Sequence, residues 1–295
     1  MDLLTLRKSM EAQNYIFDEE LLITLHVALK LGKPLLIEGA AGVGKTEIAK
    51  VLAAINGVEL IRLQCYSGLD ESKALYEWNY QKQLLSIQIG SVCNMDGDKN
   101  QTALDSLFTR EYLLERPLLR SINSEIRTVL LIDEVDKTDE EFEAFLLELL
   151  SDFQISIPEL GTISAKSKPV VILTSNNSRQ LSDALRRRCA YLFIDYPTVE
   201  KEMKIIHARL SGVPERLAKE AAEAVSFLRE NERIFKKPSI AETLDWVAAL
   251  MAINKKSLDE DGLEKTLGFL LKNREDQQEL WKDEKVNAIF SEKHR

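Results

Sequence analysis

Short apolar runs bounded by glycine, proline or charged residues recur through the first two thirds of the chain. Such runs predict buried β-strands at residues 34–37, 58–63, 129–132, 170–173 and 190–194. Between them, apolar side chains recur at helical spacing in residues 15–31, 45–56 and 139–152. Strands that alternate with helices predict an α/β fold, in which helices cover a parallel sheet on both faces.

The pattern changes after Pro197. Residues 198–295 contain no convincing strand, whereas apolar positions follow helical spacing around 217–228, 244–251 and 267–271. Ser239, which follows a proline, is expected to cap the N-terminus of one of these helices. We therefore expect an α/β domain over residues 1–197 and a smaller all-helical domain over residues 198–295.

The composition fits globular domains and removes several classes of protein. Of the 295 residues, 45% are hydrophobic and 29% are charged, which excludes a disordered or collagen-like chain. The net charge of −9 argues against a surface built to coat nucleic acid, although a local basic patch is compatible with it. Cys65, Cys93 and Cys189 lack the spacing of a metal site or a disulfide framework.

The N-terminus shows no secretory signal, and no apolar stretch is long enough to cross a membrane. We therefore expect a cytoplasmic protein without a transmembrane segment, with peripheral membrane association left open.

The strongest chemical signal lies in residues 39–46, which match the pattern GxxxxGK[ST]. Glycines let backbone amides turn toward a phosphate, and the helix that follows presents its N-terminus to the same anion. Lys45 is expected to reach the β- and γ-phosphates of ATP, and the Thr46 hydroxyl to bind Mg²⁺. The alternative is a chance match, but the motif follows a predicted strand and opens a predicted helix, as the mechanism requires. The expected ATP-binding residues of this loop are Gly39, Ala40, Ala41, Gly42, Val43, Gly44, Lys45 and Thr46.

The predicted strand 129–132 runs directly into Asp133 and Glu134. Ligands bind at the carboxyl edge of a parallel sheet, where these acids would lie. Asp133 is expected to hold the Mg²⁺ of the bound ATP, and Glu134 to polarise the attacking water. Alone, the pattern is weak, because an acidic pair before a helix such as 139–152 is common. The phosphate loop upstream favours the catalytic interpretation.

Two polar features follow the strand 170–173. Asn176 would face the γ-phosphate or its attacking water if this strand lies beside the strand of Asp133. Asn177 is the rival position, and a simple turn cap is the structural alternative. A run of three arginines comes next, and it is either a solvated helix end or the source of an arginine finger for a neighbouring subunit's nucleotide. These arginines are Arg186, Arg187 and Arg188.

The order of phosphate loop, Asp-Glu pair, sensor asparagine, late arginine and helical lid resembles the AAA+ ATPases. The details resemble the MoxR family and its CoxD-like branch. The most specific segments are Tyr-Glu-Trp-Asn at 76–79 and Ile-Pro-Glu-Leu-Gly-Thr-Ile at 157–163; others are Arg-Pro-Leu-Leu at 116–119, Asp-Tyr-Pro at 195–197 and residues 237–246. The resemblance covers the chain from about residue 14 to residue 275.

This resemblance implies a chaperone-like ATPase that forms a hexameric ring with ATP between subunits. MoxR proteins work with a von Willebrand A-domain partner, and the CoxD-like branch is associated with metal-centre maturation of molybdenum-containing carbon monoxide dehydrogenase and related client enzymes. By position, Lys45 and Thr46 correspond to Walker A and Asp133 and Glu134 to Walker B. Asn176 corresponds to sensor 1, and Arg188 to the arginine finger.

Two segments correspond to insertions of this family, and one position departs from the family pattern. Residues 67–125 would contain the helix-2 insert, and residues 153–168 the pre-sensor-1 hairpin; ordinary surface loops are the alternative. Ala241 stands near the place where many members carry a sensor 2 arginine. Lys236 or Lys237 lacks the planar fork of arginine, so no residue is assigned to sensor 2.

Other functions stay open as alternatives. A GTPase would need a guanine-reading Asn-Lys-x-Asp motif, and the nearest match, residues 254–257, lacks the Asp. A small-molecule kinase would not need Glu134 together with Arg188. An AAA+ nucleic-acid machine of clamp-loader type is disfavoured by the acidic charge. A P-loop module with negligible turnover is disfavoured by the intact Walker residues.

Overall fold

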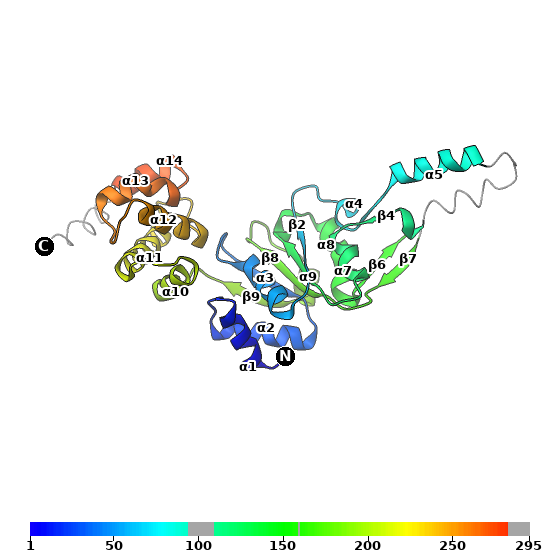
Figure 1. The fold of residues 1–295 in the computed structure, drawn as a ribbon, viewed down its shortest axis with the longest axis horizontal. Coiled ribbons are helices and arrows are strands. Elements are labelled where there is room, and N and C mark those ends of the chain that lie inside the picture. The colour runs from blue at the N-terminus through cyan, green and yellow to red at the C-terminus, as the bar shows by residue number, and fades with distance from the viewer. Residues whose placement is uncertain (94–108, 159, 283–295) are drawn as a thin grey trace. The chain divides into compact units, whose positions relative to one another are not determined.

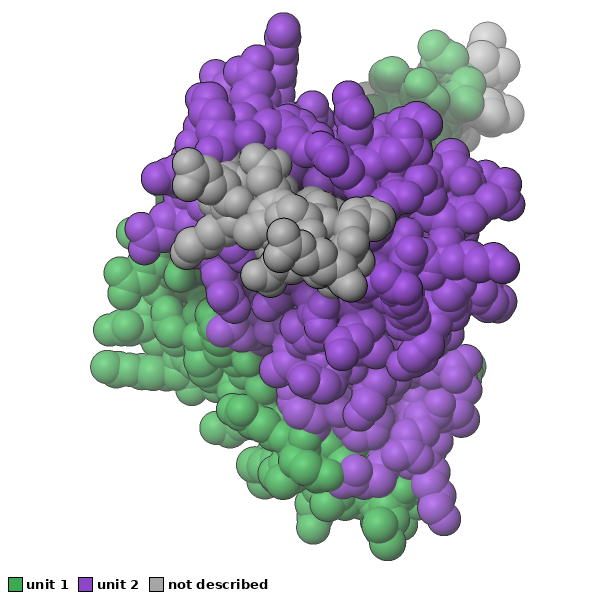
Figure 2. Space-filling view, turned by 90° about the vertical axis from the view of Figure 1, so that its left-hand side faces the viewer, with its two compact units in different colours: residues 1–6, 19–39, 45–193 green, residues 7–18, 40–44, 194–295 purple. Residues whose placement is uncertain are grey.

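The computed structural model describes residues 1–93, 109–158 and 160–282 (Figure 1). The chain separates into two compact units, drawn green and purple in Figure 2. The first comprises Met1–Leu6, Glu19–Gly39 and Lys45–Phe193, and the second comprises Arg7–Asp18, Ala40–Gly44 and Ile194–Arg295. Residues 94–108 of the predicted insert, Glu159 of the predicted hairpin and 283–295 of the predicted lid lie outside the described residues.

A five-stranded sheet with the order β2-β5-β8-β1-β9 forms the centre of the first unit. Strand β5 pairs in parallel with β2 and β8, and β8 pairs in parallel with β1. Every residue of β1 and β5 is buried, as expected for a sheet covered on both faces. The strands are β1 (Leu35–Gly39), β2 (Leu60–Gln64), β5 (Val129–Asp133), β8 (Val170–Ser175) and β9 (Ala190–Ile194).

Alternation along the strands divides the core between the two faces of this sheet. Leu130 and Ile132 of β5 join a cluster that also contains buried side chains of helices α7 and α8. Leu131 and Asp133 point to the opposite face, and helix α3 packs along β5 there. The helices of this unit are α2 (Glu19–Leu31), α3 (Lys45–Asn56), α4 (Glu71–Ala74), α5 (Tyr80–Cys93), α7 (Pro117–Asn123), α8 (Glu140–Asp152) and α9 (Asp183–Arg188), with short 3₁₀ turns η1 (Arg110–Tyr112) and η2 (Val135–Lys137).

Two small antiparallel ribbons interrupt the α/β pattern. β3 (Tyr76–Trp78) pairs with β4 (Leu113–Glu115), and helix α5 leaves from the end of β3. β6 (Gln154–Ile157) pairs with β7 (Gly161–Ser164) between α8 and β8. Both ribbons fall within the segments that the family resemblance assigns to insertions, and in Figure 1 they lie with α5 to the right of the central sheet.

Helices make up the second unit after Ile194, where the described residues contain no strand. Its core contains the fully buried Trp246, whose indole Nε1 donates to the Thr266 hydroxyl at 2.8 Å. Ser239 caps helix α12, as the sequence predicts, and Glu242 completes a reciprocal capping box with it. The helices are α10 (Val199–Arg209), α11 (Glu215–Glu230), α12 (Ile240–Ala252), α13 (Glu260–Leu270) and α14 (Arg274–Lys282).

The predicted α/β fold with a helical C-terminal part is confirmed. The predicted strands and helices occur within a few residues of their expected bounds. Helix α1 (Leu3–Ala12) was not predicted, yet Leu6 and Met10 on one of its faces are fully buried. Among the helices within the described ranges, none has the length and apolar character that crossing a membrane requires.

Candidate functional site

Strand register gathers polar side chains at one edge of the central sheet. Gln64 is paired with Asp133 across β2 and β5. The pairing of Ile132 with Leu173 places Thr174 next to Asp133 on the other side. Because the strands are parallel, their carboxyl ends meet here, and this is the edge where α/β proteins bind ligands.

Asp133 is buried, and both of its carboxylate oxygens accept hydrogen bonds. Its Oδ1 lies 3.1 Å from the Thr46 hydroxyl, which comes from the first turn of α3. The same oxygen accepts from the Thr174 hydroxyl at 2.5 Å. Its Oδ2 accepts from Nε and Nη2 of Arg62, which lies two residues before Gln64 on the same face of β2. The carboxylate is therefore held by a hydroxyl from helix α3, a hydroxyl from strand β8 and a guanidinium from strand β2.

Glu134 follows directly and adopts a left-handed backbone conformation, with φ 57° and ψ 49°. A non-glycine residue rarely takes this conformation, which costs about 1–2 kcal/mol. Its backbone N–H donates to the Thr174 hydroxyl at 2.9 Å. Its two carboxylate oxygens accept from Gln64 Nε2 and Asn176 Nδ2, each at 3.1 Å. The turn thus keeps Glu134 beside Asp133 at the sheet edge.

Lys45 opens helix α3 and connects the opposite side of this cluster. Its ammonium group donates to Asn176 Oδ1 at 2.7 Å and to the Gly39 carbonyl at 2.8 Å. Burial lowers the pKa of Lys45, while the charges of Asp136, Asp133 and Glu134 act in the opposite direction. Asn176 therefore joins the lysine to Glu134 through the two ends of one amide.

Asp136 fixes the turn that carries Asn176. Its buried carboxylate accepts from the backbone amides of Asn176 at 3.2 Å and Ser178 at 2.9 Å. Burial alone would raise the pKa of Asp136, but hydrogen bonds from the Ser178 side chain and from these amides outweigh it and lower the pKa. Asn177, the rival sensor position, has a left-handed backbone, and its N–H donates to the Ser175 hydroxyl at 3.0 Å.

The glycine-rich segment Ala40–Gly44 groups with the second unit and is described there. Gly42 and Gly44 have φ values of 74° and 92°, which glycine adopts without steric cost. The Gly42 carbonyl accepts from the backbone N–H of Ile240 at 3.2 Å. A Cβ atom at Gly42 would lie 2.2 Å from the Ser239 Cβ, so no side chain fits at that position.

The three consecutive arginines of α9 have different surroundings. Arg186 lies 3.5 Å from the buried Glu38 and over the ring of Tyr191, with 5.3 Å to its centroid. Arg188 donates through Nε to the Ser151 hydroxyl and through Nη1 to the Ala184 carbonyl. Arg187 is exposed, and within the described residues its guanidinium makes no ion pair or hydrogen bond.

The structure thus brings together Lys45, Thr46, Asp133, Glu134 and Asn176, whereas the contacts of Arg188 lie elsewhere on α8 and α9. Sequence reasoning did not single out Arg62, Gln64, Thr174 and Asp136. A signal existed for the first two: Arg62 lies on the strand predicted at 58–63 and Gln64 directly follows it, and both alternate with the buried Ile61 and Leu63. Their partners depend on the strand order, which the sequence leaves open.

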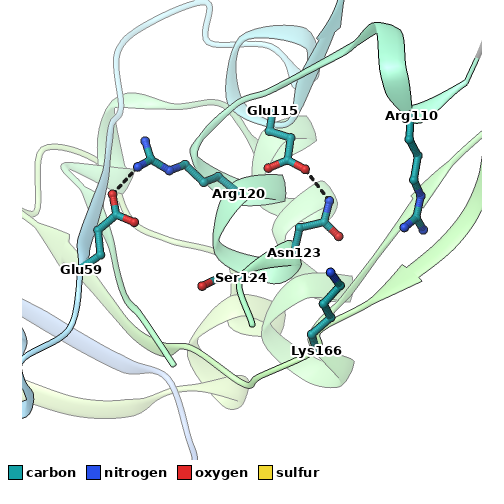
Figure 3. A pocket seen from close by; sticks show the side chains of 7 residues that line it. All are labelled: Glu59, Arg110, Glu115, Arg120, Asn123, Ser124 and Lys166. Atoms are coloured by element: carbon teal, nitrogen blue, oxygen red, sulfur yellow. Dashed lines mark hydrogen bonds and ion pairs between the residues drawn. The ribbon is translucent and has the colours of Figure 1, made fainter. Parts of the chain in front are cut away.

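A separate pocket of about 330 Å³ lies beside α7 and the small ribbons. Figure 3 shows the carboxylates of Glu59 and Glu115 turned toward Arg120 and Asn123, with which they form hydrogen bonds. Its charges thus largely compensate one another, and it shares no residue with the cluster around Asp133. The lining residues are Glu59, Arg110, Glu115, Arg120, Asn123, Ser124 and Lys166.

The oxygen donors at the sheet edge suit a hard cation that takes most of its ligands from outside the protein. Mg²⁺ prefers oxygen and is usually bound through one or two carboxylates plus substrate phosphates. The Thr46 hydroxyl and the Asp133 carboxylate supply such oxygens 3.1 Å apart. Within the described residues, no group of three or more His, Cys, Asp or Glu side chains forms an all-protein metal site. The cluster therefore fits a magnesium ion that arrives with a nucleotide.

Comparison with known proteins gives a family match for the sequence. The sequence profile of the AAA domain (dynein-related subfamily) matches residues 34–189. No curated protein sequence matches the chain. Among solved structures, the Thermotoga maritima RuvB Holliday junction branch migration motor is similar over 88% of this chain and 70% of that chain, with 23% identity and a TM-score of 0.48. A mutant of Thermotoga maritima RuvB is similar over 94% of this chain and 72% of that chain, with 20% identity and a TM-score of 0.49.

Proposed function

The chain belongs to the AAA domain family, dynein-related subfamily, and from this premise we propose that it binds and hydrolyses ATP with Mg²⁺. The observation that carries the proposal is the continuous hydrogen-bonded connection from Lys45 through Asn176 to Glu134, next to the Thr46–Asp133 contact. These groups can bind phosphate, hold a hard cation and orient a water molecule at one sheet edge.

In this proposal the residues of α3 and β5 hold the nucleotide. Lys45 exchanges its bonds to Gly39 and Asn176 for phosphate oxygens, and the lowered pKa caused by its burial is offset by the incoming negative charge. Thr46 and Asp133 would hold the Mg²⁺ ion. When bound, the ion stabilises the charge that develops on the transferred phosphoryl group.

Glu134 acts on water rather than on the nucleotide. Its carboxylate accepts a hydrogen bond from the attacking water, whose oxygen forms a bond to the γ-phosphorus as the bond to ADP breaks. Each of its oxygens accepts one hydrogen bond, from Gln64 or from Asn176, and keeps a further acceptor site for the water. Asn176 is positioned to orient the Glu134 carboxylate toward the phosphate site because it contacts both Glu134 and Lys45.

Assembly supplies the remaining part of the mechanism. We propose a homo-hexameric ring in which Arg188 reaches the nucleotide of the adjacent subunit and stabilises transition-state charge. Of the three arginines, Arg186 pairs with the buried Glu38 carboxylate, whereas Arg188 is bonded to neutral groups and Arg187 is exposed, so Arg188 and Arg187 are the candidates. The position of Arg188 in the family motif favours it.

The finer proposal is a MoxR-type, CoxD-like remodelling ATPase that works with a von Willebrand A-domain partner on a client metalloenzyme, such as a molybdenum hydroxylase. Its support is the sequence resemblance at residues 76–79 and 157–163. Helix α5, within the segment assigned to the insert, also exposes large apolar side chains, as a partner-binding surface requires. These exposed side chains are Tyr80, Leu84, Leu85 and Ile87.

The test compares the wild-type chain with Glu134→Gln in two assays. We expect Mg²⁺-dependent ATP hydrolysis by the wild type and a loss of hydrolysis in Glu134→Gln, while both bind a fluorescent ATP analogue, because Glu134 acts only on water. Unchanged hydrolysis in the variant would place the catalytic base elsewhere.

The same variant can report the partner and the client. Glu134→Gln loaded with ATP should retain a von Willebrand A-domain protein and a metalloenzyme in a pull-down from the source cell. Stimulation of the wild-type ATPase by duplex or single-stranded DNA would instead favour a nucleic-acid machine.

A further inference from the structure

Arg62 places a cation against the carboxylate that is assigned to magnesium. Its Nε lies 3.1 Å from Asp133 Oδ2, and its Nη2 forms an ion pair with the same oxygen. The two side chains differ in exposure: that of Asp133 is 5% exposed, and that of Arg62 is 51% exposed. A buried carboxylate thus takes its counter-ion from a residue at the rim of the site.

The two oxygens of Asp133 are not equally available. Oδ1 is held by the hydroxyls of Thr46 and of the buried Thr174. Oδ2 is held by Arg62, whose head group can move into solvent without disturbing the core. A divalent cation that binds beside Thr46 and also engages Oδ2, itself or through a bound water, would therefore compete with the guanidinium for that oxygen.

We propose that Arg62 is a displaceable counter-ion that neutralises Asp133 in the nucleotide-free protein and raises the Mg²⁺ concentration needed to load the site. The proposal rests on the proposed function as a Mg²⁺-dependent nucleotide-binding protein. Its physical basis is that a buried carboxylate without a partner is costly, whereas a metal ion that needs Oδ2 is repelled by the guanidinium already bound there. Arg62 supplies the partner that the Asp133 carboxylate needs in the nucleotide-free protein, and it must leave Oδ2 when the metal ion binds there.

Displacement of Arg62 also affects Glu134, the residue proposed to orient water. Its Nη2 donates to the amide oxygen of Gln64, and the amide nitrogen of Gln64 donates to Glu134 at 3.1 Å. When Arg62 leaves Oδ2, the Gln64 amide loses its fixed partner and Glu134 is held less firmly. Loading of the metal carboxylate is thereby coupled to release of Glu134.

A Mg²⁺ titration tests the competition directly. A fluorescent ATP analogue at fixed concentration is titrated with MgCl₂ in the presence of the wild-type chain, Arg62→Gln or Arg120→Gln. Arg120 is the matched control, because its ion pair with the exposed Glu59 lies outside the cluster and its loss changes the net charge equally. We expect Arg62→Gln to lower the Mg²⁺ concentration at half-saturation about three- to tenfold, the range that a partly exposed ion pair is worth, and Arg120→Gln to leave it unchanged.

An unchanged or higher midpoint in Arg62→Gln, with normal Mg²⁺-dependent binding by the wild type, would overturn the counter-ion role and leave the proposed function intact. Equal shifts in Arg62→Gln and Arg120→Gln would also overturn it, because the effect would then be one of net charge. If the wild type shows no Mg²⁺-dependent nucleotide binding, the proposed function fails and this proposal fails with it.

A second measurement uses neither nucleotide nor metal. In thermal unfolding, Arg62→Gln should lower the melting temperature of the wild-type chain by about 2–4 °C, because Asp133 loses its counter-ion. The same substitution in an Asp133→Asn background should have almost no effect, since no carboxylate remains to be neutralised. Equal losses in both backgrounds would show that Arg62 stabilises β2 by packing alone and would contradict the proposal.

Discussion

At the residue scale, Thr174 joins the two acids at the end of β5. One hydroxyl donates to Asp133 Oδ1 and accepts from the backbone N–H of Glu134. It therefore sets both the orientation of the proposed metal carboxylate and the left-handed turn that places Glu134. A hydroxyl at this position is needed because no other described side chain reaches both groups.

We predict that Thr174→Val, which keeps the shape and removes the hydroxyl, lowers ATP turnover by about tenfold or more and destabilises the fold by about 1–3 kcal/mol. Turnover is measured at saturating ATP and Mg²⁺, and stability by urea unfolding. Thr174→Ser restores the hydroxyl and is the control that should stay near wild-type turnover. Equal turnover in the Val and Ser variants would remove Thr174 from the site.

Asp136 offers a prediction that depends on pH. Because its pKa in the folded protein is lowered below the ordinary value of 3.8, the ionised form stabilises the fold. This contribution is present above pH 3.8 and is lost as the pH falls through the lower folded pKa. In Asp136→Asn, an NH₂ donor replaces one of the two oxygens that accept these backbone N–H groups, so the substitution should destabilise the protein at neutral pH.

The expected result is that the wild type and Asp136→Asn differ most in unfolding free energy near pH 7, and that the difference shrinks below about pH 4. Urea unfolding of both proteins across this range measures it, with the exposed Asp245→Asn as the control. A difference that stays constant with pH would show that Asp136 acts by packing rather than by its charge.

At the scale of secondary-structure elements, local pattern predicts the parts but not their neighbours. The apolar run before Gly39 and the glycines after it are enough to predict β1 and α3. Nothing local says that β5 lies between β2 and β8, because that order depends on contacts far apart in the sequence. For the same reason, the sequence could place Asn176 near Asp133 only if the strands before them are neighbours. It could not place Arg62 and Gln64 there at all.

Helix α1 is an element that the local sequence pattern did not predict. Its residues have a helical apolar face, but the segment is short and polar overall, so its burial is decided by packing of Leu6 and Met10. The capping box at Ser239 was predictable because both of its hydrogen bonds connect residues only three apart.

The helical unit contains an internal ion pair that can be tested at this scale. Glu202 of α10 and Arg229 of α11 are almost fully buried and form two parallel hydrogen bonds, and Arg229 also lies over the ring of Tyr196. Arg229 Nε further donates to the Pro238 carbonyl at 2.9 Å. This arginine thus links two helices to the segment before α12.

We predict that Arg229→Ala destabilises the protein by about 3–5 kcal/mol, because it leaves the Glu202 carboxylate buried without its partner. Lys265→Ala, which breaks the exposed pair with Asp261 on α13, should cost less than about 1 kcal/mol. Denaturant unfolding followed by circular dichroism gives both values. A similar small cost for the two variants would show that Glu202 finds another partner.

At the scale of the whole molecule, the proposed ring makes activity a property of the assembly. Arg188 is held within its own chain by Ser151 and Ala184, and these contacts leave its Nη2 without a hydrogen bond among the described residues. If this arginine acts on a neighbouring subunit, specific ATPase activity should rise with protein concentration as rings form. A solvated charge would show no such dependence.

We predict that Arg188→Ala binds ATP almost normally and loses on the order of 10³-fold in turnover, as expected for an arginine finger. Mixing Arg188→Ala with Glu134→Gln should restore part of the activity, because some interfaces in a mixed ring combine an intact Glu134 with an intact Arg188 from the adjacent subunit. Turnover is measured across mixing ratios, and mixed assembly is verified by copurification of two differently tagged chains. Arg187→Ala is the control and should retain turnover if Arg188 is the finger. Mixed rings without restored activity would exclude Arg188 as a trans-acting residue, and a loss of turnover in Arg187→Ala alone would transfer the role to Arg187.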